Sequence, residues 1–392
     1  MNKNNWTYKK LGEVCAHKNK ILRANKYYAP NEQINYIDIS SIDNSQNVII
    51  STTPYIFSDA PSRAQQIVKE GDILISLVRP NLKNIAIVSS NNKQLVASSG
   101  FCVLRSEADT NNRYVFYIVR GESFTKHLLG RVQGANYPAV REEDIKNYIV
   151  PIPPLADQER IVAELDLLSS IIEKKKAQLK ELDQLAQSIF YTMFGDPITN
   201  EKGWEVRKLG EVGELQRGSG LSKKDLIENG YPCILYGQIH TKYGAFTKKH
   251  IACIPQELVK TAKIAHFGDV IMAITSEDVE GSCKSVAWMG DYDIAVGSDA
   301  AIYRHTMNGI YVSYYTQTKA FYFEKAKYAK GFKVTHISTK EIANIPIPLP
   351  PLPLQQEFAS KVEAIERQKS LIQQSIDETQ TLFDSRMDYW FG

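Results

Sequence analysis

The sequence predicts an α+β protein made of two similar halves, each ending in a long helix. The two helices are expected to pack against each other as an antiparallel coiled coil with pseudo-two-fold symmetry. Three observations support this prediction. Sequence patterns recur in the two halves at a nearly constant offset, short apolar segments after Gly-Asp alternate with helical patterns, and a proline-rich segment followed by heptads closes each half.

The internal repeat rests on four pairs of segments. The offset is 198 residues at Trp6 and Trp204, and 197 from Gly71 and Gly268 onward. Four matches in nearly one register indicate the tandem duplication of a unit of about 200 residues. The pairs are WTYKKLGEV and WEVRKLGEV, EGDILISLVRP (70–80) and FGDVIMAITSE (267–277), VPIPPLADQERI (150–161) and IPLPPLPLQQEF (347–358), and MFG (193–195) and WFG (390–392).

The first part of each half is expected to be an irregular α+β domain. The segments DILISLV and DVIMAIT are rich in Ile and Val, which is typical of strands, and the Gly-Asp before each is interpreted as a turn. Aromatic residues at helical spacing predict helices around Arg113–Leu129 and Tyr311–Lys327. Between the halves, GDPITNEKG (195–203) is rich in turn-forming residues and marks the boundary.

Each proline segment is expected to lead directly into a long helix. Pro151, Pro153 and Pro154 keep the chain extended and exclude a helix before them. Asp157 is the predicted N-cap in the first copy, whereas Leu354 stands at that place in the second. A helix of roughly 30 residues is about 45 Å long, which is more than one compact domain of this size needs.

Apolar residues then recur at alternating steps of four and three for about four heptads in each helix. One lysine, Lys175 or Lys369, interrupts each seam. We expect the two helices to pack on each other, and the alternative is that each packs on its own domain. The predicted seam comprises Ile161, Leu165, Leu168, Ile172, Leu179, Leu182, Ala186, Ile189, Phe358, Val362, Ile365, Ile372, Ile376, Thr379 and Phe383.

Composition limits the possible classes of protein. The 392 residues are 43% hydrophobic and 23% charged, which is typical of a soluble globular chain, and no apolar stretch approaches a membrane span or a signal core. The five cysteines are scattered without a CxxC pair, which favours reduced thiols in a cytoplasmic protein over a disulfide framework or a zinc site. A net charge of +3 permits a nucleic-acid partner without requiring one.

Patterns for catalysis and cofactor binding are absent from the sequence. It contains no GxxxxGK[ST] loop, no GxGxxG after a strand, and no histidine spacing typical of a metal site. QRGSGLSKKD is interpreted as a loop and His266 as structural. ANYP (135–138) has the wrong order for the Asn-Pro-Pro-aromatic motif of adenine methyltransferases. We therefore predict a protein that is not itself an enzyme and holds no metal or cofactor.

Two diverged globular units, held apart by a pair of long helices, could each contact one short site on DNA. One turn of DNA is about 34 Å, so helices of this length would place the two units about one turn or more apart. Arg, Asn and Gln can make paired hydrogen bonds to base edges, and Lys neutralises phosphates. Such residues recur with aromatic residues in 131–137 and 330–336; ordinary solvated surface is the alternative for each. The candidates for DNA contact are Arg79, Asn81, Lys83, Arg131, Gln133, Asn136, Tyr137, Tyr236, Gln238, Lys242, Tyr243, Lys330, Lys333 and His336.

Over essentially its whole length the chain resembles the specificity subunit of a type I restriction–modification enzyme. The resemblance rests on the repeated W…KLGE, on GDILIS and GDVIMAI, on the two proline segments with their helices, and on the FG that ends each half. It implies target recognition domains at 1–150 and 204–345, proline segments with spacer helices at 151–195 and 346–392, and a linker at 196–203.

The resemblance also implies a non-catalytic subunit that reads a bipartite sequence in double-stranded DNA. Such a subunit recruits two modification subunits, which use S-adenosylmethionine to methylate adenine, and through them restriction subunits that use ATP and Mg²⁺. Because RPNLKNIAIVSSNNKQ has no clear counterpart around SEDVEGSCKSVAWMGD, we expect two different half-sites.

Exposed faces of the two helices are the expected docking surface for the modification subunits, with plain solvated surface as the alternative. Two other functions stay open: a specificity subunit of a methylation-only system, and a coiled-coil scaffold that binds no DNA. The residues expected at the docking surface are Glu173, Lys174, Lys176, Glu363, Glu366 and Arg367.

Overall fold

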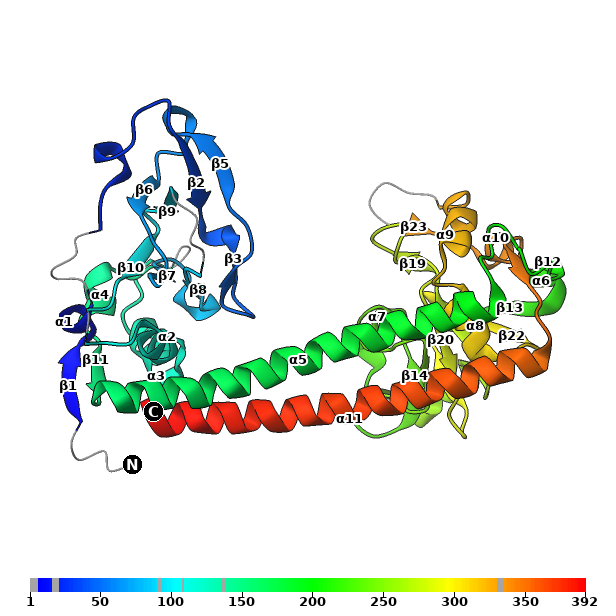
Figure 1. Ribbon diagram of the computed structural model, residues 1–392. Helices are drawn as coiled ribbons and strands as arrows, with labels where there is room; N and C mark the ends of the chain where they lie inside the picture. The colour runs from blue at the N-terminus through cyan, green and yellow to red at the C-terminus, as the bar shows by residue number, and fades with distance from the viewer. Residues whose placement is uncertain (1–5, 16–20, 90–93, 108, 135–137, 330–334) are drawn as a thin grey trace. The chain divides into compact units, whose positions relative to one another are not determined.

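The computed structural model describes residues 6–15, 21–89, 94–107, 109–134, 138–329 and 335–392 (Figure 1). It divides into two compact units. Unit 1 comprises Met1–Lys176 with Gln374–Gly392, and unit 2 comprises Ala177–Gln373. Both long helices contribute to both units, so neither unit coincides with one half of the sequence repeat.

The two helices predicted after the proline segments are present as α5 (Leu155–Phe194) and α11 (Leu352–Phe391). Each has 40 residues, a length of about 60 Å, rather than the roughly 30 residues expected from the heptads. Gly195, at a φ of 77°, follows α5 in the left-handed conformation that commonly ends helices.

The prediction that Asp157 is an N-cap is wrong. Helix α5 begins at Leu155, so Asp157 lies within its first turn, and the carbonyl of Pro154 accepts from the N–H groups of Asp157 and Gln158. In α11 the carbonyl of Pro351 accepts in the same way from Leu354 and Gln355. A proline therefore stands directly before both helices, where its missing N–H removes no helical hydrogen bond.

Unit 1 places small sheets around a core of Ile, Val, Leu and aromatic side chains. Its sheets are β1–β11, β10–β7–β8, β5–β2–β9–β6 and β3–β4. The elements are β1 (Thr7–Lys10), α1 (Leu11–Val14), β2 (Gln33–Ile37), β3 (Ile42–Asp43), β4 (Val48–Ile49), β5 (Thr53–Ile56), β6 (Ala64–Ile67), β7 (Ile73–Ser76), β8 (Ile85–Ile87), β9 (Leu95–Ser98), β10 (Phe101–Leu104), α2 (Asn112–Arg120), α3 (Glu122–Leu129), α4 (Glu142–Lys146) and β11 (Ile149–Ile152).

Unit 2 has a five-stranded sheet, β13–β22–β18–β20–β15, a four-stranded sheet, β16–β14–β21–β17, and the pairs β12–β24 and β19–β23. Its elements are β12 (Val206–Lys208), α6 (Leu209–Val212), β13 (Gly213–Arg217), β14 (Tyr231–Ile234), α7 (Tyr236–Thr241), β15 (Phe246–Thr247), β16 (Cys253–Ile254), β17 (Lys263–Ala265), β18 (Val270–Ala273), β19 (Thr275–Ser276), β20 (Ser285–Trp288), β21 (Ile294–Val296), β22 (Ala300–His305), α8 (Gly309–Tyr315), α9 (Lys319–Ala326), β23 (Thr335–His336), α10 (Thr339–Ile342) and β24 (Pro346–Pro348).

Each helix predicted from aromatic spacing is in fact two helices. Gly121 separates α2 from α3, and Thr318 caps α9 by accepting a hydrogen bond from the N–H of Phe321. Phe124 and Phe321 are buried just beyond the two breaks, so the spacing of aromatic residues suggested one continuous helix, although Tyr322 and Phe323 on α9 are exposed.

The interpretation of Gly-Asp as a turn is confirmed in both units. Gly71 and Gly268 have φ values of 85° and 88°, which favour glycine. The buried carboxylates of Asp72 and Asp269 each accept a backbone N–H three residues earlier in the chain, at 2.9 Å. The guanidinium of Arg105 also binds Asp72 through two hydrogen bonds, so the carboxylate holds the turn before the central strand.

The proline segments are fixed by the same contacts in both units. The side chain of Gln158 accepts from the N–H of Asn111 at 2.9 Å and donates to the carbonyl of Pro153. In unit 2, Gln355 joins the N–H of Asn308 to the carbonyl of Pro350 in the same way. Both glutamines are buried, and each links a proline segment to the first turn of a domain helix.

Within each unit, α5 and α11 contact each other in antiparallel order (Figure 1). In unit 1 Glu164 pairs with Arg386, and the ammonium of Lys175 donates to Ser375 and Thr379. In unit 2 Lys369 binds Asp183 at 2.7 Å, and the rings of Phe190 and Phe358 lie 5.6 Å apart. As the residue number rises along α5, that of its partner falls along α11. Every position predicted for the seam is buried or half-buried.

The glutamine contacts of unit 2 can be tested by replacing Gln355 with Leu. This change leaves a buried N–H and a buried carbonyl without their partner, so we expect a loss of about 1–3 kcal/mol. For a unit of this size, calorimetry of the full chain should show a melting temperature lower by roughly 2–10 °C. The matched control is Gln356→Leu at the exposed neighbouring position, which should melt like the wild type. Equal melting of the two variants would contradict the assignment.

Unit 2 is also expected to lose stability in mild acid because of His305. Burial lowers the pKa of this imidazole from 6.5 to about 4, so the folded unit keeps it neutral where the unfolded chain binds a proton. Its contribution is complete above pH ~6.5 and is lost as the pH falls toward 4, by up to about 3 kcal/mol. Urea unfolding across this pH range should show a smaller decline for His305→Phe; identical slopes would contradict the prediction.

Candidate nucleic-acid interface

Three segments meet at corresponding places in the two units. The first, the hairpin loop, joins β7 to β8 (77–84) in unit 1 and β18 to β20 (274–284) in unit 2. The second, the return segment, follows α3 (130–140) or α9 (327–337). The third, the flanking segment, follows β2 (38–47) or β14 (235–243).

The hairpin loop and the return segment are joined by the same backbone contacts in both units. The N–H of Val140 donates to the carbonyl of Leu77 at 2.8 Å, and that of Ile337 donates to Ile274 at 3.1 Å. These residue pairs are related by the repeat offset of 197. A bridge between Val78 and Ala139 likewise corresponds to the pairing of β19 with β23. The framework that presents the loops was therefore retained after duplication.

In unit 1 the hairpin loop has a constrained backbone. Arg79 and Lys83 adopt left-handed conformations, each at a φ of 49°, on either side of a 3-10 turn. Such backbone costs free energy and persists only where surrounding contacts enforce it. Those contacts come from the flanking segment: side-chain amides of Asn44 and Asn47 donate to the carbonyls of Leu82 and Lys83, respectively.

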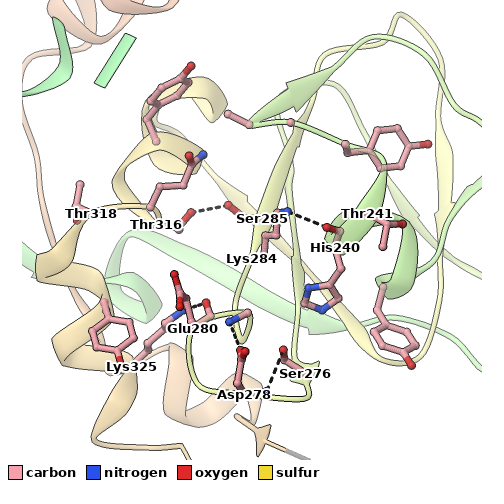
Figure 2. Close-up of a pocket in the computed structure, with 18 of the residues that line it drawn as sticks. His240, Thr241, Ser276, Asp278, Glu280, Lys284, Ser285, Thr316, Thr318 and Lys325 are labelled. Atoms are coloured by element: carbon pink, nitrogen blue, oxygen red, sulfur yellow. Dashed lines mark hydrogen bonds between the residues drawn. The ribbon is translucent and has the colours of Figure 1, made fainter. Parts of the chain in front are cut away.

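In unit 2 the flanking segment includes helix α7, and it holds the hairpin loop through His240. The Nε2 of His240 lies 3.1 Å from the carbonyl oxygen of Thr275, and the ammonium of Lys284 donates to the carbonyl of His240 (Figure 2). From the return segment, the Nδ1 of His336 lies 3.2 Å from the hydroxyl of Thr275. All three segments of unit 2 therefore converge on Thr275.

A cavity of about 1250 Å³ lies beside the hairpin loop of unit 2. Tyr236 and Tyr322 contribute aromatic surface to it, and Figure 2 shows polar side chains from the loop around it. Its charged lining has both signs: Lys284, Lys319, Lys325, Lys369, Asp183, Glu277, Asp278, Glu280 and Glu366. In unit 1 a polar cavity of about 670 Å³ is lined instead by α1, α4 and β6, away from the hairpin loop.

Most of the predicted contact residues lie on these three segments and reach the surface. Exposed side chains are those of Arg79, Asn81, Arg131, Gln133, Tyr236, Lys242 and His336, and half-buried ones are those of Lys83 and Gln238. Asn136, Tyr137, Lys330 and Lys333 lie outside the described residues.

Several of these side chains already have partners within the unit. Lys83 forms an ion pair with Glu122, whose pKa this hydrogen bond lowers. The side-chain oxygen of Gln238 accepts from the N–H of Leu235 at the start of α7, and a guanidinium nitrogen of Arg131 donates to the carbonyl of His127.

The prediction of a DNA contact by Tyr243 needs correction. Its ring is 7% exposed and packs in the core with Ile239 and Trp288, and its hydroxyl accepts from the N–H of Ile251. Burial raises the pKa of this hydroxyl to about 12. Tyr243 therefore supports the end of the flanking segment from within rather than lying on the surface.

Sequence reasoning also missed parts of this region. It did not identify the flanking segment of unit 1, although subtracting the repeat offset of 197 from α7 leads to residues 39–44. It also missed the acidic side chains of the hairpin loop in unit 2, Glu277, Asp278 and Glu280, because the search for DNA contacts concentrated on cations and amides. Among the described residues, no group of His, Cys, Asp and Glu side chains could hold a metal ion, and no helix is long and apolar enough to span a membrane.

Comparison with known proteins accounts for the duplicated framework. The family model for the type I restriction modification DNA specificity domain matches residues 3–184 and again residues 201–380. The chain belongs to this family.

Characterised relatives cover most of the chain. The Methanocaldococcus jannaschii MjaVIII specificity subunit is 24% identical over 76% of this chain and 73% of its own length, and the MjaIX specificity subunit is 21% identical over 92% and 86%. A chain from a solved type I R-M system, studied for its assembly and conformational transition, is 27% identical, with a TM-score of 0.60 and coverage of 98% of this chain and 97% of that chain.

Membership of the family assigns a role to the whole chain. It is a specificity subunit of a type I restriction–modification system, that is, a DNA-recognition subunit without catalytic activity, and the catalytic activities lie in partner subunits.

Replacing Lys242 tests whether the flanking segment of unit 2 contacts DNA. Because this exposed lysine neutralises phosphate charge in our interpretation, Lys242→Ala should weaken DNA binding on all sequences to a similar degree. It should also reduce the slope of log affinity against log salt by about one. Fluorescence anisotropy over a salt series measures both. Lys202→Ala, outside the three segments, is the control; a wild-type slope for Lys242→Ala would remove this residue from the interface.

Proposed function

We propose that the specificity subunit reads an asymmetric, bipartite DNA target, with one half-site recognised by each unit. The observation that carries this proposal is the recurrence of the same three segments in both units with unrelated side chains. The hairpin loop presents Arg79 and Asn81 in unit 1, but Glu277 and Asp278 in unit 2. Guanidinium groups suit acceptors on guanine, whereas carboxylates accept from base amino groups, so the two loops favour different base pairs.

The proposal assigns α5 and α11 the role of a spacer between the two recognition domains. Each helix is continuous for 40 residues, and their contacts in both units are antiparallel. A coiled coil of about 60 Å is rigid on the scale of one DNA turn, about 34 Å. The pair would therefore keep the gap between the half-sites constant, and the duplication supports a pseudo-two-fold relation between the domains.

Recruitment of two modification subunits is assigned to the exposed helix faces. Glu173, Lys174, Lys176 and Arg367 are exposed, as this role requires. Glu363 and Glu366 are half-buried and form ion pairs with Lys248 and Lys369 inside unit 2. Glu173 and Lys176 pair with each other but remain exposed, and this exposure favours the other four positions for docking. The modification subunits would supply S-adenosylmethionine chemistry, and restriction subunits bound through them would use ATP and Mg²⁺.

A gel-shift series tests the proposal. The chain co-purified with its modification subunits should shift a DNA pool selectively, and its affinity should fall steeply between 50 and 200 mM salt, by about 10³-fold or more, because of counterion release. A protein scaffold would give no sequence-dependent shift, and that result would overturn the proposal. Methylation without cleavage of unmodified DNA, when all neighbouring genes are expressed, would instead indicate a methylation-only system.

The spacer role predicts the effect of lengthening both helices together. Seven residues inserted after Lys176 and seven after Gln373 preserve the heptad pattern and lengthen the pair by about 10 Å. Since base pairs are about 3.4 Å apart, methylation mapping should show the same two half-sites with a gap longer by at most about three base pairs. An insertion in α5 alone should disturb the seam and reduce methylation. An unchanged gap in the double insertion would refute the spacer role.

A further inference from the structure

The backbone of the hairpin loop of unit 2 (274–284) is held partly by contacts within the loop and partly by contacts from outside it. The carboxylate of Asp278 accepts from the N–H of Gly281 at 2.6 Å, and Cys283 is held at a φ of 57°. Gly281 is in close contact with Ser276, because a Cβ on Gly281 would lie 2.3 Å from the Ser276 hydroxyl. The loop is therefore compact, and a larger residue at Gly281 would deform it.

Lys325 on α9 fixes this loop from outside. Its side chain is among the few buried charged groups of the described residues, at 4% exposure. The ammonium donates to the carbonyl of Glu280 at 2.7 Å and to that of Ser282 at 2.5 Å (Figure 2). Burial lowers the pKa of this lysine, while the charges of Asp278 and Glu280 oppose that effect. A buried ammonium bound to two carbonyls strongly restricts the backbone to which it is bound.

Comparison with unit 1 shows that a helix at this place in the domain folds without a buried lysine. Helix α3 occupies the corresponding place at the repeat offset of 197, and the residue equivalent to Lys325 is Leu128, which is also buried. Unit 1 connects the same two segments in the opposite direction, with Lys83 of the hairpin loop paired to Glu122 of α3. Both units thus connect the hairpin loop to this helix, and in unit 2 the connection is made through loop carbonyls.

The use of carbonyls has a consequence for the side chains of the loop. The hydrogen bonds of Lys325 go to backbone carbonyls, its ammonium also lies 5.7 Å from the centre of the Tyr322 ring, and the side chains of Glu277 and Glu280 are exposed beside the cavity of unit 2. Lys325 therefore holds the backbone of the loop, while the residue types at 277 and 280 are not constrained by its hydrogen bonds.

We propose that Lys325 is a positioning residue for DNA specificity, which holds the hairpin loop of unit 2 in the shape that selects the base pairs of one half-site. This inference rests on the proposed bipartite function and adds a residue that holds the hairpin loop of one recognition domain in position. Loss of the Lys325 contacts should lower discrimination at that half-site and leave the other unchanged.

The test uses the full chain with its modification subunits and a duplex carrying the target found by methylation mapping of the wild type. Affinities are measured for duplexes with single base-pair changes in each half-site. For Lys325→Leu, which introduces the residue of the sister helix, discrimination should fall about five- to a hundredfold at positions within one half-site. Discrimination in the other half-site and the salt slope should stay at wild-type values.

Two further variants make the result decisive. Lys340→Leu removes the same charge from an exposed position on α10, outside the three segments, and should discriminate like the wild type. Gly281→Ala deforms the loop without altering α9 and should reproduce the Lys325→Leu pattern, even if Lys325→Leu does not fold. Variants that melt at lower temperature but keep full discrimination would overturn the inference, because they would show a purely structural role. A wild-type complex without discrimination in either half-site would instead overturn the proposed function itself.

Discussion

The antiparallel contact between α5 and α11 is the constraint on which the rest of the structure depends. It means that each unit is completed by the end of a helix that begins in the other unit. In unit 2 the rings of Phe190 and Phe194, near the end of α5, pack against Tyr311 in the domain core. In unit 1 the last aromatic residues of α11 do the same: Trp390 stacks on Trp6, and Phe391 contacts Tyr114. Neither domain core would be closed by its own half of the sequence.

Duplication explains why the two units share one framework while their hairpin loops differ. The buried contacts of Gln158 and Gln355, and the hydrogen bonds from Tyr114 and Tyr311 to the carbonyls of Pro151 and Pro348, recur at the same offset. A change at such a buried position leaves polar groups without partners, which is costly. Exposed loop residues carry no such penalty, and so the hairpin loops were free to diverge.

Much of this architecture could be predicted from the sequence because it depends on periodic patterns. The repeat, the two long helices and the buried seam positions follow from spacing alone. The helix starts did not, since both helices begin directly after Pro154 and Pro351 and Asp157 lies inside the first turn. The breaks at Gly121 and Thr318 were hidden because a buried aromatic residue, Phe124 or Phe321, follows each break at helical spacing.

The candidate nucleic-acid interface could be predicted only in part. Cations and amides on the hairpin loop and return segment were identified by residue type, and most of them are exposed. Tyr243 was misjudged because a tyrosine between polar residues looks the same in sequence whether it lies in the core or on the surface. Lys325 was missed for the converse reason: a lysine on a helix is normally exposed, and only the fold shows that it reaches two loop carbonyls.

If two dissimilar recognition domains are joined by one helix pair of fixed length, the methylation pattern of genomic DNA should reveal it. Genomic DNA from cells expressing the wild-type chain with its modification subunits should be methylated at a single motif. That motif should have two different half-sites separated by a constant number of unspecified base pairs. A continuous motif, two identical half-sites, or a gap that varies from site to site would contradict the account.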